Sequence, residues 1–360
     1  MKNYIVKKDA IFHNLEYLLE KAGDVPVWAV LKGNGYGLGV APMAELCTMA
    51  GITHFAVTEV SEAETIRGLY PAAKILMLRP TRDREELGRM LELDVIATVG
   101  STEDAAALSS LALQRDVVAE AHVKVDTGMG RYGFHPDEAD KIVDIYRYHD
   151  RVAVSGIYTH FHSAFGKQKT VDAQAAQLQT VLNALQEGGV EAGMVHCCNS
   201  EAFLRRDDLY MGGVRLGSAI VGRVRAKSGL QRVGVCRVTV EELHWLQEGQ
   251  TTGYGAAWKA KRPTRIAVLP VGWYHGFTVE YGNDIFRFRD CLRQAVGAVK
   301  RMIFGKKLYV TVNGKKCPVL GHVGMLHTAV DVTKILVKPG DTAELEINPL
   351  QVRGLEIVFE

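Results

Sequence analysis

VWAVLKGNGYGLG, residues 27–39, is the stretch from which the fold of this chain can be inferred. Its first five residues are apolar, as is typical of a strand buried on both faces. Lys32 follows them and precedes alternating glycines, so it stands where a strand ends and a flexible turn begins. At the mouth of a parallel barrel, partial desolvation would lower the pKa of this amine and make it a nucleophile. The alternative is a solvated lysine in a glycine-rich turn.

Strand-like and helical patterns alternate through the first two thirds of the chain. The strand-like runs are 27–31, 54–57, 74–78, 95–98, 121–125, 152–158, 194–197 and 210–216. Eight such runs separated by helices over roughly 200 residues predict a (β/α)8 barrel. An open doubly wound sheet would give the same alternation. The barrel is favoured because the count reaches eight and because polar, reactive residues follow the strand ends.

The pattern changes from about residue 225 onwards. Runs at 233–240, 265–271, 307–312 and 342–347 are strand-like, turn signals such as Asn313-Gly314 separate some of them, and no amphipathic helix of comparable length is evident. We therefore predict a barrel domain over residues 1–227 and a mainly β domain over residues 228–360. Residues 1–8 are a candidate for pairing with the β domain.

Composition and charge narrow the classes of function. The formal net charge is +2 without a basic cluster, so we expect no nucleic-acid and no membrane partner. The N-terminus lacks the apolar core of a signal peptide and no apolar run is long enough to span a bilayer, so we expect a cytoplasmic protein. The six cysteines and twelve histidines lack metal-ligand spacing, which favours buried thiols and predicts neither a disulfide framework nor a metal site.

Five short motifs resemble those of one enzyme family, the alanine racemases. Residues 29–39, AVLKGNGYGLG, resemble the family's lysine motif AVVKANAYGHG, which binds pyridoxal phosphate (PLP). The other four are KVDTGMGR at 124–131, HCCNS at 196–200, GGVRLGS at 212–218 and TGYGA at 252–256. The resemblance covers nearly the whole chain and implies a PLP-binding barrel followed by a C-terminal β domain.

The resemblance also implies roles for individual residues around the cofactor. Lys32 would bind PLP covalently, His160 would pack against its pyridine ring, and Arg215 would point to the ring nitrogen. The hydroxyls of Tyr36 and Ser200 and the backbone amides of a glycine-rich turn would hold the phosphate. The full set of implied cofactor residues is Lys32, Tyr36, His160, Asn199, Ser200, Arg215, Gly217 and Ser218.

Racemisation requires that a proton leave one face of the α-carbon and return to the other, so two bases are needed. The resemblance assigns these roles to Lys32 and Tyr254. It assigns Arg131 and Met325 to the substrate, because a guanidinium fork suits a carboxylate. It also implies that Lys124 supports Arg131, since the corresponding lysine is carbamylated in some members.

The second domain departs from the family pattern. His275 and Leu326 replace aspartates, and the family's closing Tyr-Glu pair has no visible counterpart in residues 348–360. We predict a PLP-dependent racemase of a small amino acid, alanine first and serine second, that is a homodimer with shared active sites and supplies D-alanine to a bacterial cell wall. Two alternatives stay open: a barrel-type PLP amino-acid decarboxylase, and a catalytically weak PLP-binding homologue with a regulatory role.

Overall fold

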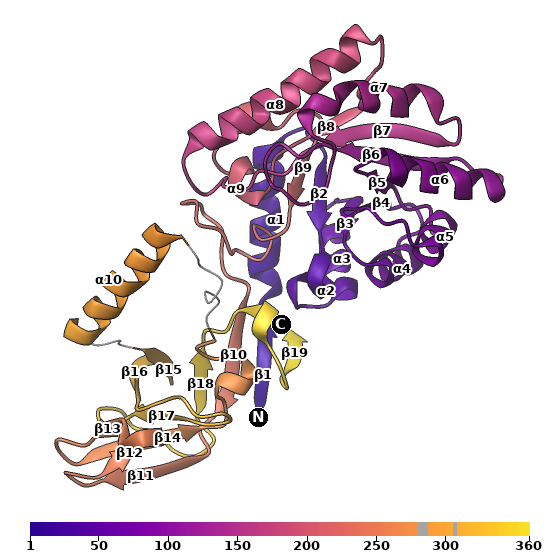
Figure 1. Cartoon of the computed structure of the whole chain (residues 1–360). Coiled ribbons are helices and arrows are strands. Elements are labelled where there is room, and N and C mark those ends of the chain that lie inside the picture. The colour runs from indigo at the N-terminus through magenta and orange to yellow at the C-terminus, as the bar shows by residue number, and fades with distance from the viewer. Residues whose placement is uncertain (280–286, 305–307) are drawn as a thin grey trace. The chain divides into compact units, whose positions relative to one another are not determined.

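The computed structural model describes residues 1–279, 287–304 and 308–360 (Figure 1). The chain divides into two compact units. The larger unit is Lys8–Val233, and the smaller one combines Met1–Lys7 with Gly234–Glu360. The boundary predicted from the sequence, 227/228, lies slightly before this division at 233/234.

The structure describes every residue of the larger unit. Parallel strands form its centre. One sheet has the order β4-β3-β2-β9 and the other the order β5-β6-β7-β8. The strands are β2 (Val27–Val30), β3 (His54–Val57), β4 (Lys74–Met77), β5 (Ala97–Val99), β6 (Ala119–Lys124), β7 (Val152–Tyr158), β8 (Met194–His196) and β9 (Val214–Leu216).

Backbone contacts join the two sheets at both sides. A parallel bridge between Leu76 and Ile96 joins β4 to β5. On the other side the amide of Arg215 donates to the carbonyl of Cys198 at 3.0 Å, next to the ends of β9 and β8. Eight parallel strands closed in this way confirm the predicted (β/α)8 barrel.

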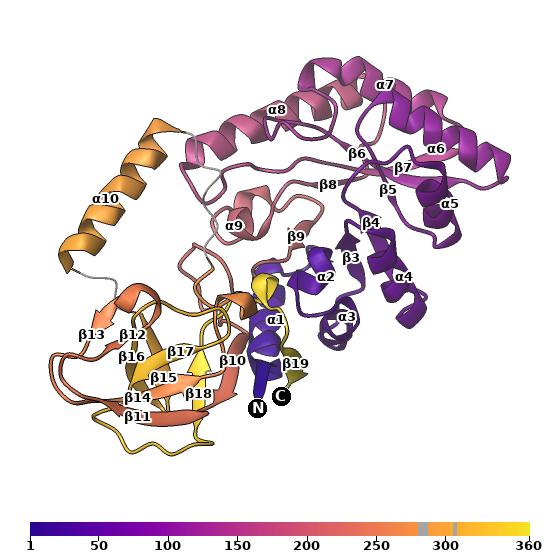
Figure 2. The same cartoon turned by 60° about the horizontal axis from the view of Figure 1, so that its bottom comes forward.

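Helices alternate with these strands along the chain (Figures 1 and 2). They are α1 (Lys8–Ala22), α2 (Lys32–Tyr36), α3 (Val40–Met49), α4 (Val60–Leu69), α5 (Arg84–Glu92), α6 (Thr102–Gln114), α7 (Ala139–Tyr148), α8 (Gln168–Glu187) and α9 (Ser200–Phe203). The strands bury apolar side chains between them, among which Trp28, Leu76 and Ile96 belong to one cluster. This rigid core carries the loops that follow the strand ends.

The smaller unit is mainly β. Its strands are β1 (Lys2–Val6), β10 (Gly234–Thr239), β11 (Glu242–Leu246), β12 (Thr251–Thr252), β13 (Trp258–Lys259), β14 (Thr264–Leu269), β15 (Tyr309–Val312), β16 (Lys315–Leu320), β17 (Thr328–Asp331), β18 (Thr342–Leu345) and β19 (Glu356–Phe359). β1 pairs antiparallel with β10. Asn313 and Gly314 connect β15 to β16 with φ of 47° and 76°, the positive values that a two-residue hairpin requires. Residue 307, where the predicted strand 307–312 begins, lies outside the described residues.

One expectation for the smaller unit was wrong. A 17-residue amphipathic helix, α10 (Phe288–Phe304), lies between β14 and β15. β-Branched residues and Gly297 lower its intrinsic helix propensity, yet apolar residues recur at helical spacing along it. The apolar side chains that it exposes are Phe288, Leu292, Val296, Val299, Met302 and Ile303. Cys291 on this helix is also exposed, whereas the other five thiols are buried as expected.

Candidate active site

The turn after β2 places Lys32. Gly33, Asn34 and Gly35 all have left-handed backbone conformations, with φ of 63°, 55° and 62°. Glycine adopts these angles freely and asparagine is one of the few other residues that does so, which explains the alternating glycines. The turn brings the Lys32 side chain to the wall of two cavities.

The two cavities have volumes of about 250 Å³ and 210 Å³. Both are lined by Lys32, Leu78, His160 and Arg215, so they adjoin at these side chains. The larger cavity also contains the residues assigned to the cofactor phosphate, Tyr36, Ser200, Gly217 and Ser218, together with Asn199, which was assigned to the cofactor. The smaller cavity also contains Thr58, Arg79, Lys124, Arg131, Tyr132 and Tyr158. The barrel therefore brings together every site residue that the sequence assigned to it.

Hydroxyl and amide donors gather at one end of the larger cavity. Ser200 Oγ accepts hydrogen bonds from the amides of Gly217 at 3.1 Å and Ala219 at 3.2 Å, so its own proton is left to donate elsewhere. Burial raises the pKa of Tyr36 to about 12, against a smaller lowering by a backbone hydrogen bond from Ser218, and keeps the phenol protonated. A Cβ on Gly217 would overlap the Tyr36 ring. This cluster of donors suits a phosphate.

Asn199 lines the same cavity, but its polar atoms contact the protein backbone. Its Oδ1 accepts from the amide of Ala202 at 3.1 Å and caps α9, while its Nδ2 donates to the carbonyl of Phe161 at 3.1 Å. The side chain therefore fixes the start of α9, where Ser200 lies.

Arg215 is fully enclosed and almost all of its guanidinium is engaged. Nη1 donates to the carbonyl of His196 at 2.8 Å and lies 2.7 Å from His196 Nδ1, and Nη2 donates to the carbonyl of Thr159 at 2.6 Å. Nε has no hydrogen-bond partner among the described residues. Because Arg215 lines both cavities, Nε–H is the donor available for a group bound there.

Lys124 is buried beside cations and aromatic rings. Its Nζ lies 4.9 Å from the centre of the Tyr158 ring, and Arg215 Cζ lies 5.0 Å from the same ring. Burial, followed by the charges of Arg215 and Arg131, lowers the pKa of Lys124 to about 7. Lys124 is thus an amine that is substantially neutral near physiological pH.

Asp126 organises the loop that carries Arg131. Its carboxylate accepts from the amides of Gly128 at 2.9 Å, Gly130 at 3.1 Å and Arg131 at 3.0 Å. Burial acts to raise the pKa of this carboxyl, but the backbone hydrogen bonds outweigh it and hold the pKa below its ordinary value. The loop therefore presents Arg131 to the smaller cavity on a fixed backbone.

Lys32 and His160 are both shifted towards their neutral forms. Burial lowers the pKa of Lys32, and the charges of Arg131 and Arg215 lower it further, whereas Glu62 raises it. Burial and then Arg215 hold the pKa of His160 well below its ordinary value. The Lys32 amine and the His160 imidazole, both with pKa values below their ordinary ones, thus face the shared part of the two cavities.

Tyr254 and Met325 lie in the smaller unit, where both line a cavity of about 570 Å³. Leu326, His244, His322 and His327 line it too. Tyr254 is 73% exposed, because it sits in a short turn with Gly253 and Gly255 at φ of 82° and 67°. His275, which replaces a family aspartate, is buried and its Nδ1 accepts from the amide of Gly272 at 3.2 Å.

Several residues at the site were missed in the sequence. His122 and Tyr158 lie inside predicted strands, and their polar side chains in otherwise apolar runs were the available signal. His196 was recognised only as the first residue of the HCCNS motif, without a role. Glu62 and Arg79 carry no such signal, since charged residues on a helix or after a strand are usually solvated. Among the described residues no cluster of three or more His, Cys, Asp or Glu side chains could hold a metal, and no helix is long and apolar enough to cross a membrane.

Comparison with known proteins identifies the class. The family model for the alanine racemase N-terminal domain matches residues 6–224, and the model for the C-terminal domain matches residues 235–352. The alanine racemase of Desulforamulus reducens is 31% identical over 340 residues, which cover 92% of this chain and 85% of that protein. The alanine racemase of Methanococcus maripaludis is 29% identical over 319 residues, which cover 86% of this chain and 78% of that protein.

Solved structures agree in fold. Alanine racemase from Streptomyces lavendulae aligns with a TM-score of 0.84 and 22% identity, covering 100% of this chain and 97% of that one. The structure of alanine racemase from Bartonella henselae has covalently bound pyridoxal phosphate. It aligns with a TM-score of 0.82 and 21% identity, covering 100% of this chain and 99% of that one. The fold and site thus define an amino-acid racemase of the PLP-dependent barrel class. The chain belongs to the alanine racemase family.

Proposed function

We propose that this chain interconverts L-alanine and D-alanine with pyridoxal phosphate by a two-base mechanism, with serine as the second substrate. One observation carries the proposal: the Lys32 amine lies between a phosphate-type donor cluster and a cavity that contains Arg131. A nucleophilic amine, an anion cradle and a carboxylate partner are the groups that a PLP racemase requires.

The residues of the larger cavity fit the cofactor. The hydroxyls of Tyr36 and Ser200 would donate to its phosphate. The amides of Gly217 and Ser218, which donate to those two hydroxyls in this structure, would turn to it, and His160 would pack against its ring. The unpartnered Nε–H of Arg215 would face the ring nitrogen. When bound, PLP draws electron density from the substrate's α-carbon and weakens its C–H bond.

Two bases on opposite sides of the substrate would move the proton. Burial lowers the pKa of Lys32, which increases the share of neutral amine that can accept a proton at neutral pH. Tyr254 belongs to the other unit, and we infer that it reaches the site of the partner subunit in a homodimer. A two-fold dimer would form two such shared sites.

The smaller cavity supports a small substrate. Its volume is about 210 Å³, and Arg131 in its wall would pair with the substrate carboxylate through a guanidinium fork. Lys124 nearby has a pKa of about 7, so its neutral form could react with carbon dioxide to give a carbamate that supports Arg131. Met325 would contact the substrate from the second unit.

The decarboxylase alternative is disfavoured by Arg215. PLP enzymes that exploit a strong electron sink place a carboxylate against the ring nitrogen, and arginine cannot accept a proton there because it is already charged. A weaker sink favours prompt return of the proton.

The regulatory alternative is disfavoured because a protein that only binds PLP would not require Lys32, Arg131 and Tyr254 together. A cytoplasmic location and a role in supplying D-alanine for a bacterial cell wall complete the proposal, and both follow from the resemblance.

A coupled enzymatic assay tests the function. Purified protein with PLP should form D-alanine from L-alanine faster than D-serine from L-serine, and should release negligible carbon dioxide from carboxyl-labelled alanine. Release of carbon dioxide faster than D-alanine formation would favour the decarboxylase. PLP binding without turnover of either substrate would favour the regulatory homologue.

A further inference from the structure

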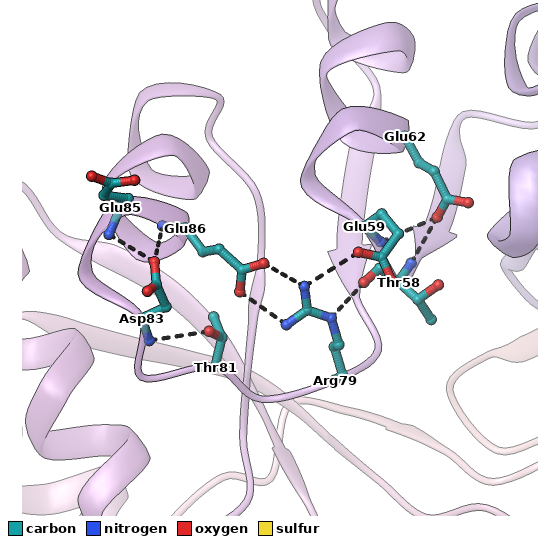
Figure 3. Close-up of polar contacts among 8 residues, drawn as sticks. All are labelled: Thr58, Glu59, Glu62, Arg79, Thr81, Asp83, Glu85 and Glu86. Atoms are coloured by element: carbon teal, nitrogen blue, oxygen red, sulfur yellow. Dashed lines mark hydrogen bonds and ion pairs between the residues drawn. The ribbon is translucent and has the colours of Figure 1, made fainter.

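Glu62, on α4, is a buried carboxylate that is 6% exposed and accepts three backbone hydrogen bonds. Its Oε1 accepts from the amide of Asn34 at 2.9 Å. Its Oε2 accepts from the amides of Thr58 at 3.0 Å and Glu59 at 3.2 Å, as Figure 3 shows. Glu62 therefore ties the turn that follows Lys32 to the loop that follows β3.

The central residue of the turn after Lys32 is not glycine. Asn34 has φ of 55°, a left-handed conformation that asparagine tolerates better than most residues because its short polar side chain can hydrogen-bond locally. Its own side chain supplies one constraint, since Oδ1 accepts from the amide of Val40 at 3.2 Å. The bond from the Asn34 amide to Glu62 connects this turn to a separate helix, and it acts two residues away from Lys32.

Arg79 fixes the loop on the other side of Glu62 (Figure 3). Its Nε donates to the carbonyl of Thr58 at 2.6 Å, and its two terminal nitrogens bind Glu86 on α5 at 2.9 Å and 2.6 Å. This fork is a bidentate pair, the geometry that makes arginine–carboxylate contacts specific. The loops after β2, β3 and β4 are thus joined through two side chains, Glu62 and Arg79.

Charge gives Glu62 a second effect on Lys32. The charged and titratable groups that face the amine or share its cavities are mostly basic. They are Tyr36, Arg79, Lys124, Arg131, Tyr132, Tyr158, His160, His162, Glu201 and Arg215. Arg79 is neutralised by Glu86 and Glu59. Among the groups that shift the pKa of Lys32, Glu62 is the one that raises it, against burial, Arg131 and Arg215.

We propose that Glu62 is a positioning residue for Lys32: through its hydrogen bond to the Asn34 amide it fixes the left-handed turn and holds its carboxylate on the segment that carries the amine. The inference goes beyond the proposed function, because it concerns the state of Lys32 in the chain without substrate. Arg79 assists by holding Thr58, one of the amide donors to Glu62.

The charge is tested on the full chain after PLP has been removed. Lys32 is labelled by brief reductive methylation with formaldehyde and cyanoborohydride over a pH series, and its extent is read by peptide mass spectrometry. Glu62→Gln removes the charge, so the neutral amine should persist to lower pH, and labelling below the wild-type midpoint should be about threefold faster or more, which corresponds to half a pKa unit. Glu64→Gln, which changes a half-buried carboxylate on the same helix that pairs with Arg89, should leave the midpoint unchanged. A Glu62→Gln midpoint equal to or above that of the wild type would overturn the proposal.

The positioning effect is tested by amide hydrogen exchange. Glu62→Asp keeps the charge but shortens the side chain, so peptides that span residues 32–36 should exchange faster than in the wild type, while those from β3 should not. Glu62→Asp also keeps the proposal testable if Glu62→Gln does not fold. Equal exchange at 32–36 would contradict the proposal. Neither measurement needs turnover, so failure of the racemase assay and failure of this inference are separate results.

Discussion

Arg215 Nη1 lies 2.7 Å from Nδ1 of His196, and this contact determines the tautomer of the imidazole. Arginine has only donors, so Nδ1 must accept and the ring proton must be on Nε2. His196 Nε2 lies 2.9 Å from His122 Nδ1, to which it then donates. Burial, followed by the charge of Arg215, holds the pKa of His196 well below its ordinary value and lowers that of His122 to about 3. A chain of two neutral imidazoles therefore supports Arg215 from inside the barrel.

His196→Phe should show what this support contributes to stability. An aromatic ring is kept, although a phenyl is larger than an imidazole, and a buried guanidinium loses one acceptor, which costs about 1–3 kcal/mol. The free energy of unfolding, measured by urea titration with far-UV circular dichroism, should fall by that amount. An unchanged unfolding midpoint would mean that Arg215 does not depend on this contact.

Gly217→Ala should weaken cofactor binding. A Cβ at this position would lie 2.6 Å from Tyr36 Cε2, so the Tyr36 ring must move away from the phosphate-type cluster. Loss of one hydrogen bond to a charged group, about 1.5–3 kcal/mol, predicts a rise in the Kd for PLP of roughly tenfold or more. Spectroscopic titration of the protein freed of cofactor gives the Kd. The control is Gly68→Ala, where a Cβ meets nothing within 4 Å; equal Kd values for the two variants would refute the role of Gly217.

Lys124 should make stability depend on pH in a defined window. Its pKa is about 7 in the folded chain and near 10.5 when unfolded, so between these values the unfolded state binds more protons. The free energy of unfolding therefore rises with pH from about 7 to 10.5, by up to about 1.4 kcal/mol per pH unit. Below pH 7 the cost of burying the charged Lys124 amine is at its maximum.

Lys124→Met removes that titration. In buffer free of carbon dioxide, the variant should be more stable than the wild type at pH 6 by several kcal/mol, at about 1.4 kcal/mol per pKa unit. The two unfolding free energies should converge as the pH rises to 9.5. Parallel curves over pH 6–9.5 would show that Lys124 is not desolvated in the native state.

Much of the barrel could be predicted from the sequence, because each buried parallel strand is a short apolar run bounded by helical patterns. The turn at Lys32 could also be predicted, since Gly33 and Gly35 need positive φ. The contact between His122 and His196 could not, because these residues are 74 positions apart on strands separated by β7. Helix α10 was missed because the surrounding strands and turns made a β interpretation consistent throughout the smaller unit.

Mixed dimers test the proposal that active sites are shared between two subunits. Neither Lys32→Ala nor Tyr254→Phe should be active alone, but a heterodimer would contain one site with both native residues. Random reassociation of equal amounts should therefore restore up to about a quarter of the wild-type sites. D-Alanine formation after mixing and reassociation measures this fraction. An active monomer at assay concentration, or no recovery from demonstrated heterodimers, would contradict sites shared between subunits.

The most direct test of the two-base mechanism compares proton exchange in Tyr254→Phe and wild-type protein in deuterium oxide. Each enantiomer of alanine is supplied separately, and α-deuterium and product chirality are measured together. We predict that Tyr254→Phe slows racemisation by about 10²–10⁴-fold, the usual contribution of a positioned acid–base group. It should still exchange the α-proton of the enantiomer that faces Lys32, with retention of configuration. Racemisation within a few-fold of the wild-type rate would contradict the assignment of Tyr254 as the second base.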